Sequence, residues 1–538
     1  MNHTQALTRA LSVLPSPADL RSMTRAPRRD LLCGLTVAVV ALPLALGFGV
    51  TSGLGAAAGL TTAVVAGALA ALFGGSARQV SGPTGAMTVV LVPIVHRYGA
   101  DGVLTVGLMA GVLLLLLAFA RAGAAMAYVP APVIAGFTLG IACVIALQQV
   151  PAALGVPTPH GEQVAVVAAR AAEEFGGAPH WPALLLAAGA AAIVLAGARW
   201  RPAVPFSLVA VAAVTVAAEA LHLSVTRIGT LPASLPAPSL SFLDLSRLPS
   251  LLAPAAAVAA LAALESLLSA SVADGMRPGE RHDPSKELFG QGIANLAVPL
   301  FGGVPATGAI ARTAVNVRTG AASRLAALAH AVILAGIVAV AAPLVGRIPL
   351  AALAGVLLAT AVRMVERDAV RAMARATRGD ALVLVLTAGA TLALDLVRAV
   401  LIGLGVSVLL ALRAAMRGTR LTPAAADELP GEVGTVTYRF DGPLLFAAAH
   451  RFRCGLADVH DGVSAVDLRL SGLTAVDATG ALALKEAVAE LRGRGVDVRI
   501  SGVDLDHRRV LESCGVLTSA GAGAKRGVVP SAAGMTAP

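Results

Sequence analysis

Two short stretches of the chain share the core Thr-Gly-Ala. They are Ser81–Met87 and Val304–Ile310, which place Thr84 and Thr307 223 positions apart. Both stretches lie between apolar runs, and both are too short and too polar to cross a bilayer alone. Non-helical backbone persists in a membrane only where it lines a cavity, and a helix that begins there points free N–H groups into it. The repeat therefore predicts two half-helices whose N-terminal ends share a binding site.

The start of a helix attracts anions because it behaves as about half a positive charge. At an effective dielectric constant of about 20 and a distance of about 4 Å, one such end attracts a monovalent anion by about 2 kcal/mol. Glycine lets the backbone approach a ligand closely, and threonine can cap the helix or donate its hydroxyl. The predicted anion contacts are Thr84, Gly85, Ala86, Thr307, Gly308 and Ala309. The alternative is two ordinary helix starts, where proline is common.

Glu265 is the only charged residue in the apolar run Leu251–Val272. A carboxylate in the middle of a membrane is costly unless it is protonated, paired or hydrated. This predicts an ion-coupling site, for H+ or Na+, in which Ser269 one turn later supplies a second oxygen. The alternative is a structural carboxylate that is hydrogen-bonded to a neighbouring helix.

Arg312 lies inside the second predicted half-helix. It either adds positive potential to the anion site or extends its side chain to the cytoplasmic edge of the membrane.

The sequence offers no signature of an enzyme. The ten histidines form no metal-ligand cluster, and no nucleophile triad is visible, so we expect no catalytic residues, no metal and no cofactor. No GxxxxGK[ST] loop is present to hold a nucleotide, so an ion or anion gradient must supply the energy.

The composition is that of an integral membrane protein. Hydrophobic residues make up 57% of the 538, charged residues only 13%, and the mean hydropathy is +0.80. The net charge of +10 comes from arginines in short clusters between apolar runs, as in cytoplasmic loops, which argues against a nucleic-acid partner. Four cysteines, two in apolar runs and two in the polar tail, imply no disulfide framework.

Fourteen segments are predicted within or across the membrane, and the basic residues 1–30 precede them in the cytoplasm. Because fourteen is even, both termini lie on one side, and the arginine distribution indicates the cytoplasmic side of a plasma (bacterial inner) membrane. The segments are Leu31–Val50, Leu54–Phe73, Pro83–His96, Val103–Ala120, Val129–Val150, Pro182–Ala198, Pro202–Leu221, Leu251–Val272, Leu288–Leu300, Ala306–Val317, Leu325–Val345, Ile348–Val362, Ala381–Leu394 and Ala399–Leu412.

The two halves of this region are related. The octapeptide ALPLALGF from Ala41 aligns with ALESLLSA from Ala263 at nearly the offset of the Thr-Gly-Ala cores. With seven segments in each half, residues 31–221 and 251–412 must cross the membrane in opposite directions, as inverted repeats.

A second domain follows the membrane domain of residues 31–412. We expect a polar linker at 413–430, a small α/β domain at 431–518 and a disordered tail at 519–538. The α/β assignment rests on alternating apolar residues around Val436–Phe440 and Val466–Leu470, a helical run, the strand-like Val496–Ile500 and a last helix.

Several longer segments resemble the SulP family of anion permeases, the sulfate permease or solute carrier 26 family. They are RDLLCGLTVAVVALPLALGFGVTSG from Arg29, ALFGGSARQVSGPTGAM from Ala71 and KELFGQGIANLAVPLFGGVPATGAIARTAVNVRTG from Lys286. The tail, from GTVTYRFDGPLLFAAA at Gly434 to VDATGALAL at Val476, is similar to a STAS domain. The resemblance implies an all-α, UraA-like membrane fold of seven-plus-seven inverted repeats. It also implies an elevator-like motion of a core against a gate domain, a homodimer, and an anion held at the two half-helix starts.

The resemblance also bears on substrate and coupling. Glu265 falls where family members carry an acidic coupling residue, and similar permeases with Asp there are sodium-coupled, so Glu favours protons. Leu44 stands where many members have Gln, and LPLALGFG resembles bacterial bicarbonate and dicarboxylate permeases. We therefore expect transport of sulfate, bicarbonate or a dicarboxylate, driven by protons or by exchange. The alternatives are sodium-coupled bicarbonate uptake, a nucleobase permease of the same fold, and a membrane sensor that signals through the STAS domain.

The stretch from Asp477 to Gly480 resembles the loop that is phosphorylated in free-standing STAS proteins, with Thr479 at the hydroxyl position. A phosphate there would sit at a helix start, whose N–H groups favour negative charge, and a cytoplasmic partner could bind this domain. The alternative is that Asp477 and Thr479 only cap the helix that begins near Gly480.

Overall fold

The chain folds into two compact units, Met1–Ser407 and Val408–Pro538, each described here by itself. The computed structural model describes residues 21–124, 129–159, 163–201, 204–232, 234–276, 281–394, 396–417, 420–423, 435–445 and 463–517. The expected disordered tail and residues 1–20 of the expected N-terminal segment lie outside these ranges.

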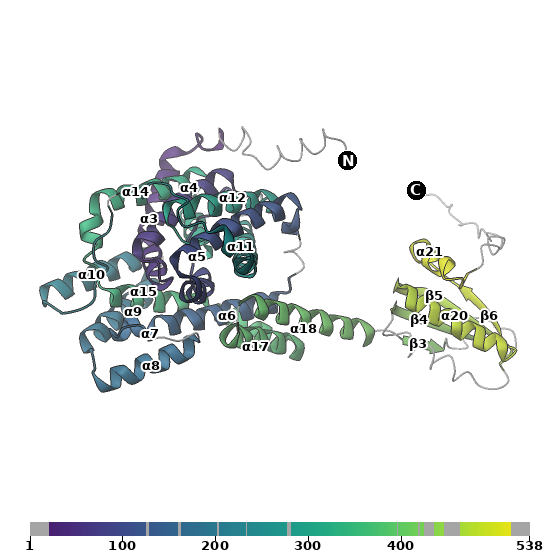
Figure 1. The fold of residues 1–538 in the computed structure, drawn as a ribbon. Helices are drawn as coiled ribbons and strands as arrows, with labels where there is room; N and C mark the ends of the chain where they lie inside the picture. The colour runs from purple at the N-terminus through teal and green to yellow at the C-terminus, as the bar shows by residue number, and fades with distance from the viewer. Residues whose placement is uncertain are drawn as a thin grey trace, which may run out of the picture. The chain divides into compact units, whose positions relative to one another are not determined.

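The first unit is built from helices (Figure 1). In its first half they are α3 (Pro27–Thr51), α4 (Ala56–Phe73), α5 (Gly85–Phe119), α6 (Ala131–Gln148), α7 (Val150–Leu154), α8 (Val164–Gly177), α9 (Trp181–Trp200) and α10 (Phe206–Ala220). The second half holds α11 (Leu248–Met276), α12 (Pro284–Ala297), α13 (Ile310–Arg318), α14 (Leu325–Val345), α15 (Leu350–Met364), α16 (Arg367–Ala376), α17 (Arg378–Ala393) and α18 (Leu396–Arg417), which extends into the second unit. Short 3-10 turns, η2 (Leu245–Arg247) and η3 (Val298–Phe301), complete it.

Each of the fourteen predicted segments contains a helix, and among the described residues seven helices are long and apolar enough to span a membrane. Within α5, Gly99 has a left-handed φ of 73°, which kinks the chain. The kink divides the half-helix Gly85–Tyr98 from the span that follows it, as the sequence predicted.

Three helices were not predicted: α7 beyond Val150, α8 and α16. Each is too short, or too soon interrupted by charged residues, to form a long apolar run, so a search for such runs passes over them.

The helices of the first unit pack as two groups. We call α3, α4, α5, α11, α12, α13 and α14 the site group, because α5 packs on α11 and α12, α3 on α4, α13 and α14, and α11 on α13. We call α6, α9, α10, α15 and α17 the flanking group, because α6 packs on α15 and α17, and α9 on α10 and α15.

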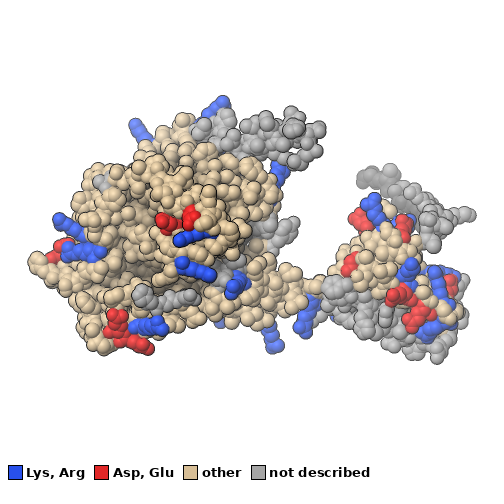
Figure 2. Space-filling model, viewed as in Figure 1, with Lys and Arg blue, Asp and Glu red and all other residues tan. Residues whose placement is uncertain are grey.

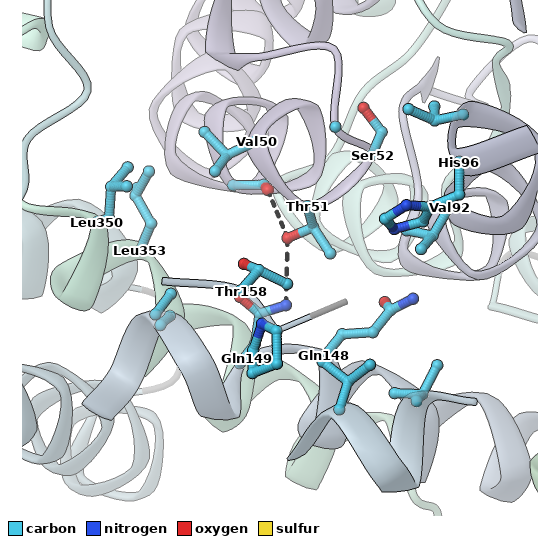
Figure 3. A pocket seen from close by; sticks show the side chains of 18 residues that line it. Val50, Thr51, Ser52, Val92, His96, Gln148, Gln149, Thr158, Leu350 and Leu353 are labelled. Atoms are coloured by element: carbon cyan, nitrogen blue, oxygen red, sulfur yellow. Dashed lines mark hydrogen bonds between the residues drawn. The ribbon is translucent and has the colours of Figure 1, made fainter. Parts of the chain in front are cut away.

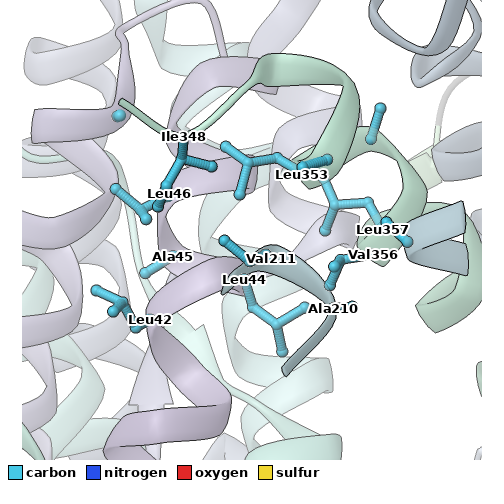
Figure 4. Packing of buried hydrophobic residues seen from close by; sticks show 14 of the residues in the cluster. Leu42, Leu44, Ala45, Leu46, Ala210, Val211, Ile348, Leu353, Val356 and Leu357 are labelled. Atoms are coloured by element: carbon cyan, nitrogen blue, oxygen red, sulfur yellow. The ribbon is translucent and has the colours of Figure 1, made fainter. Parts of the chain in front are cut away.

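The contact between the groups along α3 is apolar (Figure 4). Leu44 is 5% exposed and lies in one buried cluster with Ala210 and Val211 of α10 and Leu357 of α15. The position where many family members carry Gln is therefore part of a hydrophobic contact in this chain.

A two-stranded antiparallel ribbon is buried among the helices of the site group. Strand β1 (Ser81–Gly82) pairs with β2 (Thr307–Gly308), with Ser81 opposite Gly308 and Gly82 opposite Thr307. Both strands are buried, and each directly precedes a half-helix, so the two halves of the chain meet where the sequence repeats.

The second unit contains a sheet of order β3-β4-β5-β6, with helices α20 (Ala478–Gly493) and α21 (Leu505–Ser513). Strands β4 (Thr435–Leu444), β5 (Ala465–Val476) and β6 (Asp497–Ser501) are parallel, and β3 (Arg420–Pro423) is antiparallel to β4. In Figure 2 both positively and negatively charged side chains are visible on this unit, whereas the visible face of the first unit is mostly uncharged.

The expected linker at 413–430 is partly wrong. Helix α18 continues to Arg417, and Arg420–Pro423 joins the sheet instead of remaining unstructured. Polar composition indicated a linker, but an edge strand needs only backbone hydrogen bonds to its neighbour, so a polar segment can form one.

Candidate functional site

The ribbon brings the starts of the two half-helices together. Because β1 leads into α5 and β2 leads into α13, their pairing places Thr84 and Thr307 at one locus, although they are far apart in the sequence. Both threonines are buried, at 5% and 0% exposed.

Thr84 caps the first half-helix and donates its hydroxyl at the same time. Its Oγ1 accepts a hydrogen bond from Met87 N at 3.3 Å and donates to Glu265 Oε2 at 2.8 Å. The backbone N–H groups of Gly85 and Ala86 precede the first intrahelical bond, from Thr88 N to Thr84 O, so they have no partner within the helix.

The second half-helix begins later than the Thr-Gly-Ala core suggested. Ala309 is its N-cap and provides no side-chain bond, so Thr307 does not cap it. Gly308 N donates to Ser266 Oγ at 2.9 Å, and Ala309 N donates to Val80 O at 2.9 Å. The Gly308 N–H joins β2 to α11, and the Ala309 N–H joins the end of β2 to the residue before β1, which leaves the first-turn groups from Ile310 onward as the ones directed along the helix start.

Glu265 of α11 lies against both helix starts. Its side chain is buried, accepts the Thr84 hydroxyl and also faces the Thr307 hydroxyl. The Arg312 guanidinium is close enough to attract it electrostatically. Glu265 therefore lies beside both repeated threonines, and its role in ion coupling stays a prediction.

Arg312 does not extend to the membrane edge. It is 1% exposed, and Nη2 donates to Pro83 O at 2.9 Å, next to the start of the first half-helix. Its Nη1 is buried and has no partner among the described residues. The edge alternative is wrong because the first turn of α13 lies inside the protein, which leaves Arg312 as positive charge at the site.

The Ser269 hydroxyl is hydrogen-bonded to α13 and not to Glu265 in this structure. Its hydroxyl donates to Thr313 Oγ1 at 2.9 Å, and Thr313 Oγ1 in turn accepts Val80 N at 3.0 Å. The predicted second oxygen for a coupling ion is thus engaged in holding α13 against β1.

Two site residues were missed from the sequence. Ser266, whose Oγ lies 3.0 Å from Thr307 Oγ1, joins the second Thr-Gly-Ala core to α11, and its position beside Glu265 was the available signal. Gln79 is 5% exposed, and a Cβ on Gly308 would collide with its amide nitrogen. Both amide atoms of Gln79 lack a partner among the described residues, so it is a polar group free to meet a ligand.

The site combines one carboxylate, one guanidinium and the positive ends of two helices. Such a site can hold an anion through N–H and hydroxyl donors, and the carboxylate can take up a proton or a cation. In the part of the chain that is described, no three His, Cys, Asp or Glu residues are grouped to hold a metal ion.

In the second unit, Asp477 caps α20. Its Oδ1 accepts Gly480 N at 2.7 Å, while Thr479 is exposed in the first turn of the helix. The capping alternative thus describes Asp477, and phosphorylation of Thr479 stays a prediction.

Comparison with known proteins agrees with this architecture. The Sulfate permease family model matches residues 28–387, and the STAS domain model matches residues 427–521. A Bacillus subtilis protein named as a sulfate transporter, YvdB, is 34% identical and spans 92% of this chain and 95% of its own. The bicarbonate transporter BicA of Picosynechococcus is 31% identical and spans 90% of both chains.

Two solved structures resemble this chain. The transmembrane domain of a cyanobacterial BicA superimposes with a TM-score of 0.64 at 32% identity, over 71% of this chain and 98% of that one. Murine Slc26a9 in its inward-facing state gives 0.83 at 16% identity, over 94% of this chain and 91% of that one, which shows a shared fold. The chain therefore belongs to the sulfate permease family, as an anion transporter of the SulP and solute carrier 26 type that carries a C-terminal STAS domain.

Proposed function

We propose that the protein is a secondary active transporter that moves sulfate, bicarbonate or a dicarboxylate across the plasma membrane. The transport is coupled to protons or to the exchange of another anion. The observation that carries the proposal is the bond from Thr84, the cap of the first half-helix, to the buried carboxylate of Glu265. The Glu265 carboxylate, which can take up a proton, thereby contacts the start of the half-helix that attracts the anion.

Charge balance provides a physical reason for coupling. With Glu265 ionised, its negative charge offsets Arg312, and only the partial charges of the two helix ends attract the anion. Protonation of Glu265 would leave Arg312 and the two helix ends uncompensated, so the anion would bind more strongly. A proton and an anion would then enter together, and each would favour the binding of the other.

The packing of the helices supports an elevator-like motion. Glu265, Arg312, β1 and β2 all belong to the site group, so the bound anion can move with that group as a body. The contact of α3 with α10 and α15 contains a cluster of buried hydrophobic side chains, which suits sliding. We further propose a homodimer, as the family resemblance implies, with both termini in the cytoplasm, as the even number of segments and the arginine distribution indicate.

Sodium coupling is the second candidate. Sodium is a hard cation that prefers oxygen ligands, and the hydroxyl oxygens of Thr84 and Thr307 face the Glu265 carboxylate, with Ser266 Oγ 3.0 Å from Thr307 Oγ1. The nucleobase and sensor alternatives gain no comparable observation, since the relatives compared above are named as sulfate or bicarbonate transporters.

A substrate panel in proteoliposomes tests the proposal. Purified protein is reconstituted, and uptake of labelled sulfate, bicarbonate, succinate and uracil is measured with an inward proton gradient, an inward sodium gradient, or neither. We expect uptake of at least one of the three anions that increases with the proton gradient. Stimulation by sodium alone would favour the second candidate, and uptake of uracil alone would contradict an anion carrier.

A further inference from the structure

A cavity of about 370 Å³ opens beside the C-terminal end of α3. Because α3 starts near the N-terminal segment and ends at Thr51, the cavity lies on the membrane side opposite that segment. Figure 3 shows side chains that line it from both helix groups, including Thr51, His96 and Leu353. The described lining residues include no Lys, Arg, Asp or Glu, so the polar groups here are neutral amides and hydroxyls and one histidine.

Two adjacent glutamines at the end of the α6 segment reach across this cavity to the site group (Figure 3). Gln149 Nε2 donates to Thr51 Oγ1 of α3 at 3.2 Å. Gln148 Oε1 lies 3.5 Å from Thr88 Oγ1 of α5. The flanking group thus contributes polar side chains directly to the helices that carry the anion site.

The other end of the Gln148 amide is free. Gln148 Nε2 is buried and has no partner among the described residues. A buried donor without a partner costs about 1–3 kcal/mol, so such a group is expected to meet water or a ligand. Gln148 lines the cavity, and because its Nε2 is itself buried, a rotation of the side-chain amide would present this donor to a ligand there.

The position of Gln148 links the cavity to the first half-helix. Thr88 lies one turn after the cap Thr84, and its hydroxyl donates to Gly85 O at 2.7 Å. Ile145, one turn before the glutamines on α6, lies against Gly85. A ligand at Gln148 is therefore about one helical turn from the half-helix start at which the anion is proposed to bind.

We propose that this cavity is an entry site for a small oxyanion, in which the Gln148 side-chain N–H donates to an oxygen of the ligand. The inference rests on the proposed function and adds a second ligand position to it. Neutral donors bind an anion without a fixed cation to retain it, which suits a site that the ligand must leave again. The Gln148 carbonyl oxygen can accept the hydroxyl of bicarbonate, whereas sulfate offers acceptors only.

The first test is Gln148→Ala in proteoliposomes with one orientation of the protein. Loss of one hydrogen bond to a charged ligand should raise KM about tenfold for anion supplied on the cavity side. The KM for anion supplied on the opposite side and the kcat should not change. Gln163→Ala is the matched control, because Gln163 is exposed before α8 and does not line the cavity.

A second test does not depend on how Gln148→Ala folds. In a chain whose four cysteines are replaced by serine, Val95→Cys is labelled from the cavity side with a membrane-impermeant thiol reagent. Sulfate or bicarbonate, whichever is transported, should slow the labelling. Val166→Cys, at an exposed position of α8 outside the cavity, should be labelled at the same rate with and without the anion.

The outcomes separate this inference from the proposed function. Transport with an unchanged KM in Gln148→Ala, together with no protection of Val95→Cys, would overturn the entry site while leaving the carrier intact. Absence of anion transport by the unaltered chain would contradict the proposed function, and the protection experiment would still decide whether the cavity binds the anion.

Discussion

At the scale of single residues, one repeated tripeptide has two different structural roles. Thr84 caps a helix and donates to Glu265, whereas Thr307 lies in a strand and contacts Ser266. The difference arises because α13 starts after its Thr-Gly-Ala core, while α5 starts inside its own. Both threonines nevertheless lie beside the same carboxylate, which makes Glu265 the residue whose chemistry is most directly testable.

We expect Glu265→Gln to uncouple transport from the proton gradient. The amide keeps the size of the side chain and can still accept the Thr84 hydroxyl, but it cannot gain or lose a proton. Anion exchange without a gradient should persist, whereas stimulation by an acidic outside should disappear. The measurement is uptake against external pH in proteoliposomes, and a pH dependence equal to that of the unaltered protein would rule out the coupling role.

We expect Gly308→Val to abolish or strongly weaken anion binding. A side chain there would collide with the Gln79 amide and press on Ser266, so these polar groups would be displaced from the site. Loss of one hydrogen bond to a charged ligand costs about 1.5–3 kcal/mol, or about 12- to 150-fold in Kd. Equilibrium binding of the transported anion to detergent-purified protein measures the effect. Gly336→Val is the control, since Gly336 on α14 has open space around it. Wild-type affinity in Gly308→Val would count against the site.

At the scale of elements, caps and kinks determine where the functional helices begin and end. Gly99 separates the first half-helix from the next span, and the ribbon of β1 with β2 aligns the two helix starts. In the second unit the cap of α20 is Asp477, the first residue of the stretch that resembles the phosphorylated loop.

We expect Asp477→Ala to destabilise the start of α20 by about 1 kcal/mol, because the N–H of Gly480 loses its acceptor. Amide hydrogen exchange of the intact protein should show faster exchange in the first turn of α20. The exposed Thr479 provides the matched change, and Thr479→Ala should leave exchange there nearly unaltered. Equal acceleration in both variants would indicate that Thr479 shares the capping role.

At the scale of the whole molecule, the anion site and the STAS domain belong to separate compact units. Every described group of the proposed site, from Gln79 to Arg312, comes from the first unit. The second unit has its own hydrophobic core, built from residues such as Phe440, Leu468 and Leu484.

We expect deletion of residues 418–538 to leave anion transport by the purified protein unchanged in substrate preference and pH dependence. The deletion starts after α18, so it removes the whole sheet and leaves every membrane segment in place. Uptake in proteoliposomes, with size-exclusion chromatography as the check on folding, measures the result. A folded truncated protein without transport would show that the carrier needs its C-terminal unit.

Much of this architecture follows from the sequence alone. Long apolar runs must be satisfied inside a bilayer as helices, and two Thr-Gly-Ala cores between such runs indicated paired interruptions. The lone charge of Glu265 in an apolar run marked it as functional for the same reason. These inferences rest on local rules of solvation and hydrogen bonding, which act on each segment independently.

Only the tertiary structure decided which donor meets which acceptor. Arg312 is buried beside Pro83 instead of reaching water, and Ser269 holds Thr313 instead of facing Glu265. The structure adds three residues that the sequence did not single out: Gln79, Ser266 and Gln148. They reach these sites because segments far apart in the chain pack together, and a local sequence pattern does not show such packing. The edge strand β3 could not be predicted from the sequence for a similar reason. Its hydrogen bonds depend on the backbone of β4 and not on the side chains of β3 itself.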